Sequence, residues 1–338
     1  MDWEEVRRTA KERFKGACRV CRVCNGVACA GEMPGMGGIG TGASFTANVE
    51  ALAGYKLVLR TLHDVNAPQT QIELFGRTLS SPILGAPVAG TWLNMNDAIP
   101  ERDLAHALIA GCAAAGTVGM TGDGPDPMLY PTGLEVIAAQ GGTGIPIIKP
   151  RPEEDIIARI RQAEEAGAWA VGVDVDAAGI IGMVRAGQPV GPHPPETWER
   201  IIAQTELPFI LKGIMTPDEA ETAIDVGAAA IVVSNHGGRI LDHTPGTAEV
   251  LPDIADIVNG EIALLVDGGV RSGSDVLKML ALGADAVLVG RPLAVAAVGG
   301  GAEAVAALLN RYTDELRAAM ILTGTAAADE VDESVLYL

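Results

Sequence analysis

The chain has 338 residues, aromatic residues make up only 4% of them, and the formal net charge at pH 7 is −19. This acidic balance argues against nucleic acid or an anionic membrane as a partner, because both are negatively charged. No uninterrupted apolar run reaches the ~20 residues of a membrane span, and the charged first residues lack the apolar stretch of a signal peptide. We therefore expect a cytoplasmic protein.

In our interpretation the first 45 residues form an N-terminal arm, which holds four of the five cysteines. Cys18, Cys21, Cys24 and Cys29 follow the spacing C-x₂-C-x₂-C-x₄-C. In a cytoplasmic chain, closely spaced cysteines favour metal binding or redox chemistry. The spacing approaches that of an iron–sulfur cluster with a last gap one residue longer, and tetrahedral zinc is also open. A disulfide, or reduced thiols without a special role, are the other interpretations.

A glycine-rich segment follows, from Gly31 to Gly42. Such a density of glycine disfavours a regular helix or strand, and no strand precedes it as a dinucleotide-binding motif requires. We expect a flexible segment that lies over the mouth of the next domain and closes on a substrate. A plain linker is the alternative.

From about residue 83 onward, apolar runs alternate with amphipathic stretches, which is the pattern of repeated β-strand and α-helix units. Eight strands are predicted, the number that closes a (β/α)₈ TIM barrel. They are Ile83–Ala86, Thr117–Met120, Pro146–Ile148, Ala170–Val173, Phe209–Lys212, Ala230–Val233, Ala263–Asp267 and Ala286–Val289. We assign residues 46–338 to this barrel. The predicted fold class is α/β, with an N-terminal helical, cysteine- and glycine-rich extension.

Charged residues gather where the predicted strands end, which is where barrel enzymes carry their chemistry. The fourth strand is followed by Asp174 and Asp176, and the fifth ends in Lys212. The sixth is followed by His236 and, three residues later, Arg239. An imidazole takes up protons near neutral pH, and a guanidinium binds a carboxylate through two parallel hydrogen bonds. This pair predicts proton abstraction from a small carboxylic acid.

The loops after the seventh and eighth strands have the composition of a phosphate site. Gly268, Gly269 and Gly290 allow close approach of the backbone, and the helix that follows offers free N–H groups to an anion. Arg271 and Arg291 add positive charge. These loops are the usual phosphate site of a TIM barrel, so we expect a phosphate-bearing cofactor or substrate.

Two motifs carry a family resemblance. The segments from Ser234 to Asp242 and from Asp267 to Arg291 resemble the FMN-dependent 2-hydroxy-acid dehydrogenase and oxidase family, which includes glycolate oxidase and lactate oxidase. The second motif is shared with related phosphate-binding barrels such as IMP dehydrogenase, whereas the first is more selective for the hydroxy-acid enzymes. The resemblance extends over roughly residues 46–325.

The resemblance implies a role for each matched residue. His236 would be the catalytic base, Asp176 would orient it and stabilise its imidazolium, and Arg239 would clamp the substrate carboxylate. Lys212 would stabilise the negative charge of the reduced flavin, and Ser234 would contact the flavin ring. The remaining FMN contacts would come from Ala89, Asp267, Gly269, Arg271, Gly290 and Arg291.

The chain departs from the family pattern around the substrate. Two tyrosines that the family places near the N-terminal segment and after strand three have no counterpart here. Pro146 stands where the family has Gln on strand three, and Asp174 stands where it has Thr. Lys149 is a candidate for a replacement contact with flavin or substrate.

The leading hypothesis is an FMN-dependent oxidoreductase that oxidises a small 2-hydroxy acid, such as lactate, to the 2-oxo acid. The electron acceptor is unknown, and the resemblance implies a homo-oligomer. One alternative is a non-oxidative, isomerase-like FMN barrel enzyme, because the substrate pocket is altered. Another is an electron-transfer protein in which the cysteine cluster relays electrons from the flavin to a partner.

Overall fold

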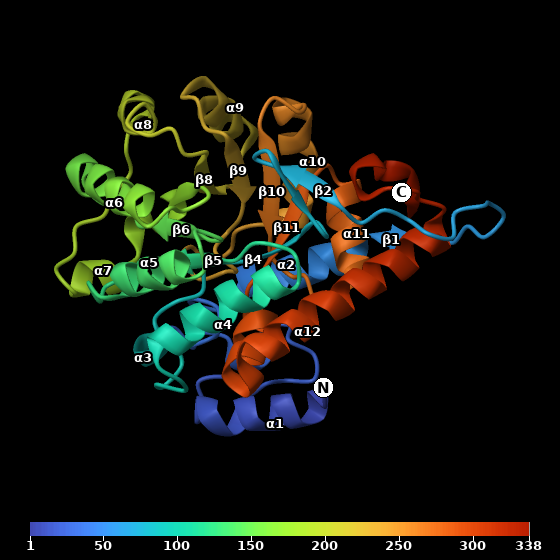
Figure 1. Ribbon diagram of the computed structural model, residues 1–338, viewed down its shortest axis with the longest axis horizontal. Helices are drawn as coiled ribbons and strands as arrows, with labels where there is room; N and C mark the ends of the chain where they lie inside the picture. The colour runs from blue at the N-terminus through green and yellow to red at the C-terminus, as the bar shows by residue number, and fades with distance from the viewer. Residues whose placement is uncertain (338) are drawn as a thin grey trace.

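Eight parallel strands surround one axis in the computed structural model, which describes residues 1–337 (Figure 1). They are β4 (Ile83–Gly85), β5 (Met120–Gly122), β6 (Ile145–Ile148), β7 (Val171–Asp174), β8 (Phe209–Ile214), β9 (Ala230–Val233), β10 (Ala263–Asp267) and β11 (Ala286–Val289). Their order is β4-β11-β10-β9-β8-β7-β6-β5, and a bridge between Gly85 and Gly119 joins β4 to β5. The predicted (β/α)₈ barrel is confirmed.

The largest shift from the predicted strand bounds is at β5, which was expected at Thr117–Met120 and lies at Met120–Gly122. Thr117 belongs instead to the turn that ends the preceding helix. Its N–H donates to the carbonyl of Cys112 at 3.0 Å, and its hydroxyl donates to the carbonyl of Ile83 at 2.8 Å. Apolar periodicity does not distinguish such a turn from the first residues of a strand.

Helices cover the outside of the barrel (Figure 1). They are α4 (Glu101–Ala114), α5 (Leu129–Ala139), α6 (Glu153–Glu165), α8 (Pro195–Ile202), α9 (Pro217–Asp225), α10 (Thr247–Val258), α11 (Gly273–Ala281) and α12 (Arg291–Thr323). Two short helices, α3 (Thr91–Asn94) and α7 (Ile181–Arg185), lie at the barrel mouth. The short elements η2 (Val175–Gly179), η3 (Ala328–Glu330) and η4 (Glu333–Val335) are 3₁₀ turns. Two small antiparallel sheets pair β1 (Lys56–Leu57) with β12 (Leu336–Tyr337) and β2 (Ile72–Leu74) with β3 (Arg77–Leu79).

Helix α12 is long and apolar enough to cross a membrane by length and composition alone, although the sequence analysis found no uninterrupted apolar run of that length. The backbone is not helical at Gly300 and Gly301, so the helix is kinked there. It packs against α4 and against α1 (Trp3–Phe14), and half of its most apolar 18-residue stretch is buried inside the protein. A Cβ at Gly111 of α4 would lie 2.5 Å from the Cβ of Val305, so the two helices approach closely. Buried core helices of soluble proteins pass the same length and composition test.

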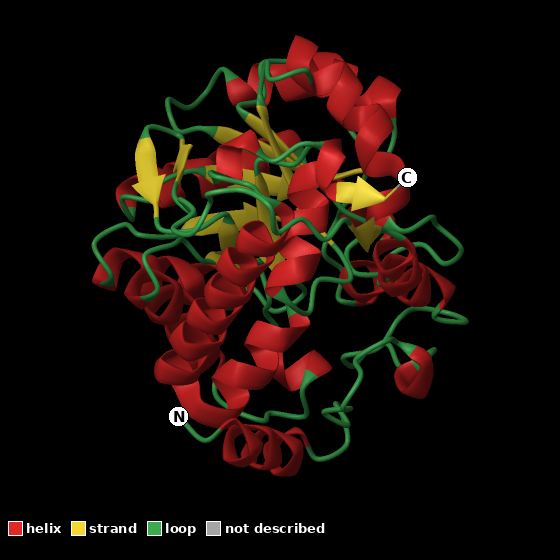
Figure 2. Cartoon of the chain, turned by 90° about the vertical axis from the view of Figure 1, so that its right-hand side faces the viewer, coloured by secondary structure: helices red, strands yellow, loops and turns green. Residues whose placement is uncertain are grey.

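The N-terminal arm reaches from the outer face of α12 to the barrel mouth. Its first helix, α1, lies at the edge of the molecule, away from the strands (Figures 1 and 2). The chain then passes through the short turn η1 (Val27–Cys29) into the glycine-rich segment and α2 (Ala43–Gly54). The predicted boundary at residue 45 falls inside α2, and the division into arm and barrel stays a prediction.

Candidate active site

A cavity of about 630 Å³ lies at the carboxyl ends of the barrel strands. This volume is in the range of small-molecule and cofactor sites. The loops after β4, β5, β7, β9, β10 and β11 line it, together with Lys149 after β6 and Lys212 on β8. Residues of the arm line it as well, namely Met33, Pro34, Met36 and Ile39. The expectation that the glycine-rich segment lies over the barrel mouth is therefore confirmed.

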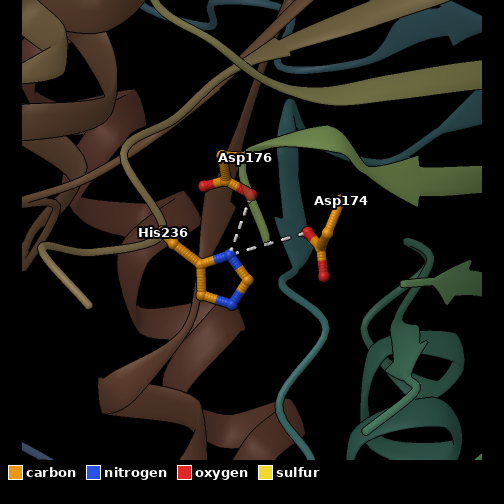
Figure 3. Close-up of side chains that lie close together, drawn as sticks. All are labelled: Asp174, Asp176 and His236. Atoms are coloured by element: carbon orange, nitrogen blue, oxygen red, sulfur yellow. Dashed lines mark hydrogen bonds and ion pairs between the residues drawn. The ribbon is translucent and has the colours of Figure 1, made fainter. Parts of the chain in front are cut away.

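His236 lines this cavity, and Asp176, which is not part of the lining, contacts the His236 ring (Figure 3). The Nδ1 atom of His236 lies 3.2 Å from Oδ1 of Asp176 and 3.8 Å from Oδ1 of Asp174. With a proton on Nδ1, the ring donates to Asp176 and keeps Nε2 free to accept a second proton. The arrangement is suited to general base chemistry, because the carboxylate stabilises the imidazolium that forms.

The backbone at His236 is strained. Its φ is +57°, in the left-handed region that side chains other than glycine rarely adopt. The hydroxyl of Ser234 accepts a hydrogen bond from the His236 N–H at 3.0 Å, and the Asn235 side chain accepts one from the Gly238 N–H at 3.0 Å. These bonds hold the loop in its turn, and such strain is common at functional sites.

A buried charge network lies behind His236. Asp174 accepts a hydrogen bond from Nζ of Lys149 at 2.6 Å, and its other oxygen lies 3.0 Å from Nζ of Lys212. Burial by itself disfavours the charged form of Asp174, but the two ammonium groups hold the pKa of this carboxyl well below its usual range. Burial likewise opposes the charge of Lys212, but Asp174 and Asp267 raise the pKa of its ammonium group. Both groups are therefore charged at neutral pH.

Ser234 lies outside the cavity lining that the structure describes. It is fully buried, accepts from Nζ of Lys212 at 3.2 Å and donates to the carboxylate of Asp267 at 2.9 Å. The expected contact of Ser234 with a flavin ring stays a prediction. Its hydroxyl contacts two residues that do line the cavity, Lys212 and Asp267.

Three guanidinium groups converge on the cavity, from Arg239, Arg271 and Arg291. Burial lowers the pKa of Arg239 to about 10. Burial, followed by repulsion from Arg239 and Arg271, lowers the pKa of Arg291 to about 9. The guanidinium of Arg291 also lies 3.8 Å from the ring centroid of Phe45. Cations brought this close together form a ready site for an anion.

The arm supplies a backbone acceptor to each of these three arginines. Arg239 donates to the carbonyl of Gly35 at 2.5 Å, and Arg291 donates to the carbonyl of Met36 at 2.8 Å. Arg271 donates to the carbonyl of Cys24 at 3.2 Å. These arm carbonyls are neutral and balance none of the positive charge.

The remaining predicted residues divide between the cavity and the arm. Ala89, Asp267, Gly269 and Gly290 line the cavity, as does the candidate Lys149. The four arm cysteines do not belong to the lining, and they are free thiols in the structure.

Sequence reasoning missed two polar residues of the cavity wall, Asn94 and Asp123. Asn94 of α3 accepts a hydrogen bond from Arg239 at 2.9 Å, and nothing in its local sequence indicates this contact. Asp123 lines the cavity and forms a buried ion pair with Arg151 at 2.7 Å. Asp123 directly follows β5, so reading every strand end for charged residues would have found it.

Comparisons with a protein family, with curated relatives and with solved structures agree with one another. The profile described as FMN-dependent dehydrogenase matches residues 35–194 and 190–338. A 4-hydroxymandelate oxidase of Amycolatopsis orientalis is 38% identical over 325 residues, covering 85% of this chain and 88% of the relative. An L-lactate oxidase of Alicycliphilus denitrificans is 34% identical, covering 89% and 90%. The structure of mandelate oxidase with (S)-2-phenylpropionate has a TM-score of 0.79 at 34% identity, covering 99% and 97%. A mandelate oxidase mutant with a C4a-OH-FMN adduct is equally similar, with a TM-score of 0.79.

Proposed function

Because the chain belongs to the family of FMN-dependent dehydrogenases, we propose that it oxidises a 2-hydroxy acid to the 2-oxo acid with His236 as the base and Arg239 as the carboxylate clamp. The protein is an oxidoreductase, and FMN is its cofactor. The observation that carries the proposal is that His236, which Asp176 contacts at 3.2 Å, lines the same cavity as Arg239.

The residues around the cavity fit FMN. The phosphate would bind at Arg271 and Arg291, where the guanidinium groups have only neutral acceptors and repel one another. Gly269 has a φ of +79°, and Gly290 lies directly before the first turn of α12, so the backbone there can approach an anion closely. Lys212 would stand at the edge of the flavin ring with its positive charge fixed by Asp174 and Asp267. Bound FMN supplies the acceptor for the hydride equivalent that leaves the substrate carbon.

His236 would take the proton of the substrate hydroxyl at Nε2 as the carbon gives up its hydride equivalent. The products are the 2-oxo acid, the reduced cofactor and an imidazolium. Asp176 would hold the ring through Nδ1 and stabilise the imidazolium, because an adjacent carboxylate favours the charged form. Asp174, 3.8 Å from Nδ1, adds a second negative charge on the same side.

Arg239 would bind the substrate carboxylate through its terminal nitrogens. Nη1 now donates to the carbonyls of Gly35 and Gly37 and Nη2 to the side chain of Asn94. A carboxylate is a stronger acceptor than a carbonyl, so we expect it to replace the arm at Nη1. Substrate binding and a shift of the arm would then be coupled.

Replacement of His236 by Ala tests the base. We expect the variant to keep its FMN and to lose reduction of the flavin by substrate, by about 10²-fold or more, because general base catalysis typically contributes that much. The measurement is the anaerobic bleaching rate of the flavin absorption in stopped flow. His106→Ala, on the exposed side of α4, is the matched control and should bleach at the wild-type rate. Equal rates in the His236 and His106 variants would remove His236 from the reaction.

The cavity wall favours a substrate with an apolar side chain. Met33 and Met36 of the arm, Trp92 and Leu93 of α3, and Met183 of α7 line the cavity. Burying a phenyl ring in place of a methyl group contributes about 1.5–3 kcal/mol, or roughly 10- to 100-fold in affinity. We therefore propose that acids with large apolar side chains are oxidised in preference to lactate.

A panel of 2-hydroxy acids tests this preference. We expect kcat/KM for mandelate to exceed that for lactate by about tenfold or more, as the burial of the ring requires. A higher value for lactate would overturn the assignment of the apolar wall to the substrate and leave the base and clamp untouched. A bound flavin that no 2-hydroxy acid reduces would instead favour a non-oxidative reaction.

A further inference from the structure

The four cysteines of the arm occupy a fixed place beside the active-site cavity. Arg7 of α1 donates to the carbonyls of Val20 and Cys21, at 2.8 and 3.0 Å. Arg271 of the cavity wall donates to the carbonyl of Cys24 at 3.2 Å. The segment that carries the cysteines is thus tied at one end to α1 and at the other to the barrel. All four thiols are partly buried and free.

The surroundings of these sulfurs contain hydrogen-bond donors and positive charge. The N–H of Val20 donates to Sγ of Cys18 at 3.4 Å, and Nη2 of Arg271 lies 3.6 Å from Sγ of Cys24. Such donors orient ligating thiolates in metal sites and tune the metal that they bind.

The four cysteines lie within twelve residues of one segment, from Cys18 to Cys29. Cysteine binds a metal as the thiolate, and each ligating thiol loses its proton when the metal binds.

The spread of the sulfurs distinguishes between kinds of metal site. Within residues 1–337, no three of these sulfurs lie within 4.8 Å of one another. A single tetrahedral zinc ion with Zn–S bonds of about 2.3 Å would need all four sulfurs about 3.8 Å apart. An iron–sulfur cluster holds its cysteines farther apart, because iron and sulfide atoms stand between them. The first two gaps, C-x₂-C-x₂-C, are those of the bacterial [4Fe–4S] run.

We propose that Cys18, Cys21, Cys24 and Cys29 bind a [4Fe–4S] cluster. The site lies in the arm, and Arg271 joins it to the cavity because this residue contacts Cys24 and also lines the cavity wall. The cluster would fix the arm whose carbonyls at Cys24, Gly35 and Met36 accept hydrogen bonds from the three arginines. The proposal stands on the arm alone and does not depend on which substrate is oxidised.

Metal and sulfide analysis of protein purified without air tests the cluster. We expect iron and acid-labile sulfide in equal amounts, about four of each per chain, and a broad visible absorption beneath the flavin bands. Cys21→Ser and Cys24→Ser should each lose most of the iron and sulfide. Cys112→Ser is the control, since Cys112 is buried in α4, and it should keep both. The FMN content of each variant reports whether the barrel has folded.

Three results would overturn the proposal. One is zinc in place of iron, which would require the arm to contract around a single ion. Another is metal-free protein whose arm cysteines form a reversible disulfide. The last is iron that survives in a Cys21→Ser, Cys24→Ser double variant with normal FMN content, because such iron is not bound by these thiols.

Discussion

At the scale of single residues, the carboxylate of Asp174 is a buried charge that depends on its charged neighbours. It is fully buried, pairs with Lys149 and Lys212, and lies 3.8 Å from the His236 ring. Removing one partner of a buried ion pair is strongly destabilising, because the charge left behind has no water to solvate it. The carboxylate thus supplies the negative charge next to the ammonium groups of Lys149 and Lys212, which both line the cavity.

We expect Asp174→Asn to lower the free energy of unfolding by about 3 kcal/mol or more, because Lys149 loses its buried counter-charge and Lys212 loses the nearer of its two, keeping only Asp267 at 3.6 Å. Urea unfolding at pH 7 measures this change. Asp225→Asn, exposed at the end of α9, is the control and should change little. The folded-state pKa of Asp174 lies below its usual value, so its contribution is full above about pH 4 and is lost only as the pH falls further. A loss under about 1 kcal/mol would mean that the lysines give up their protons instead.

At the scale of elements, the glycine-rich segment is held at the barrel mouth by contacts with the loop after β9, while its expected flexibility and closure on a substrate stay predictions. The carboxylate of Asp242, in the loop after β9, accepts from the N–H and hydroxyl of Thr41 at 2.5 and 2.8 Å and from the N–H of Ala43 at 3.1 Å. The N–H of Ile39 donates to the carbonyl of Gly238 at 2.9 Å. The loop that carries His236 and Arg239 therefore also holds the arm.

We expect Asp242→Asn to release the segment around Thr41, since the amide offers one acceptor oxygen where the carboxylate offered two. Hydrogen exchange of residues 38–45 should become faster, and Asp256→Asn on the exposed side of α10 should leave it unchanged. The N–H of Thr41 is the main cause that lowers the pKa of Asp242 to about 2. In the wild type this anchor is therefore complete above about pH 4 and is lost as the pH falls towards 2. Unchanged exchange in the Asn variant would assign the order of the segment to its backbone contacts.

At the scale of the whole molecule, charge is unevenly distributed. The net charge is −19, yet three guanidinium groups meet at the cavity. Their mutual repulsion opposes folding until an anion binds. A cofactor phosphate relieves this repulsion, and a ligand that binds only the folded state stabilises it.

We expect FMN to stabilise the apoprotein by about 2.7 kcal/mol at a concentration 100 times its Kd. Riboflavin has the same ring without the phosphate, so at equal concentration it should raise Tm much less. Thermal unfolding with each ligand makes the comparison, and added salt should weaken the effect of FMN more than that of riboflavin. Equal shifts for the two ligands would contradict phosphate binding at Arg271 and Arg291.

The sequence by itself determined the barrel and much of its site. Eight apolar runs of strand length predicted the eight strands, because a strand buried on both faces needs a continuous apolar segment. The charged residues that follow those runs identified His236, Asp176, Lys212 and Arg239, because parallel strands bring their carboxyl ends to one face of the barrel. These inferences need only local pattern and the rule of the fold.

The tertiary structure alone decided how the charges are paired and what covers the cavity. Lys149 pairs with Asp174 because β6 and β7 are neighbours in the barrel. Arg239 donates a hydrogen bond to the carbonyl of Gly35, 204 residues earlier in the chain. Ser234 follows β9, and its hydroxyl donates to Asp267 of the adjacent strand β10. Local pattern does not encode such contacts, because they form between segments far apart in the sequence and exist only when the closed barrel brings those segments together.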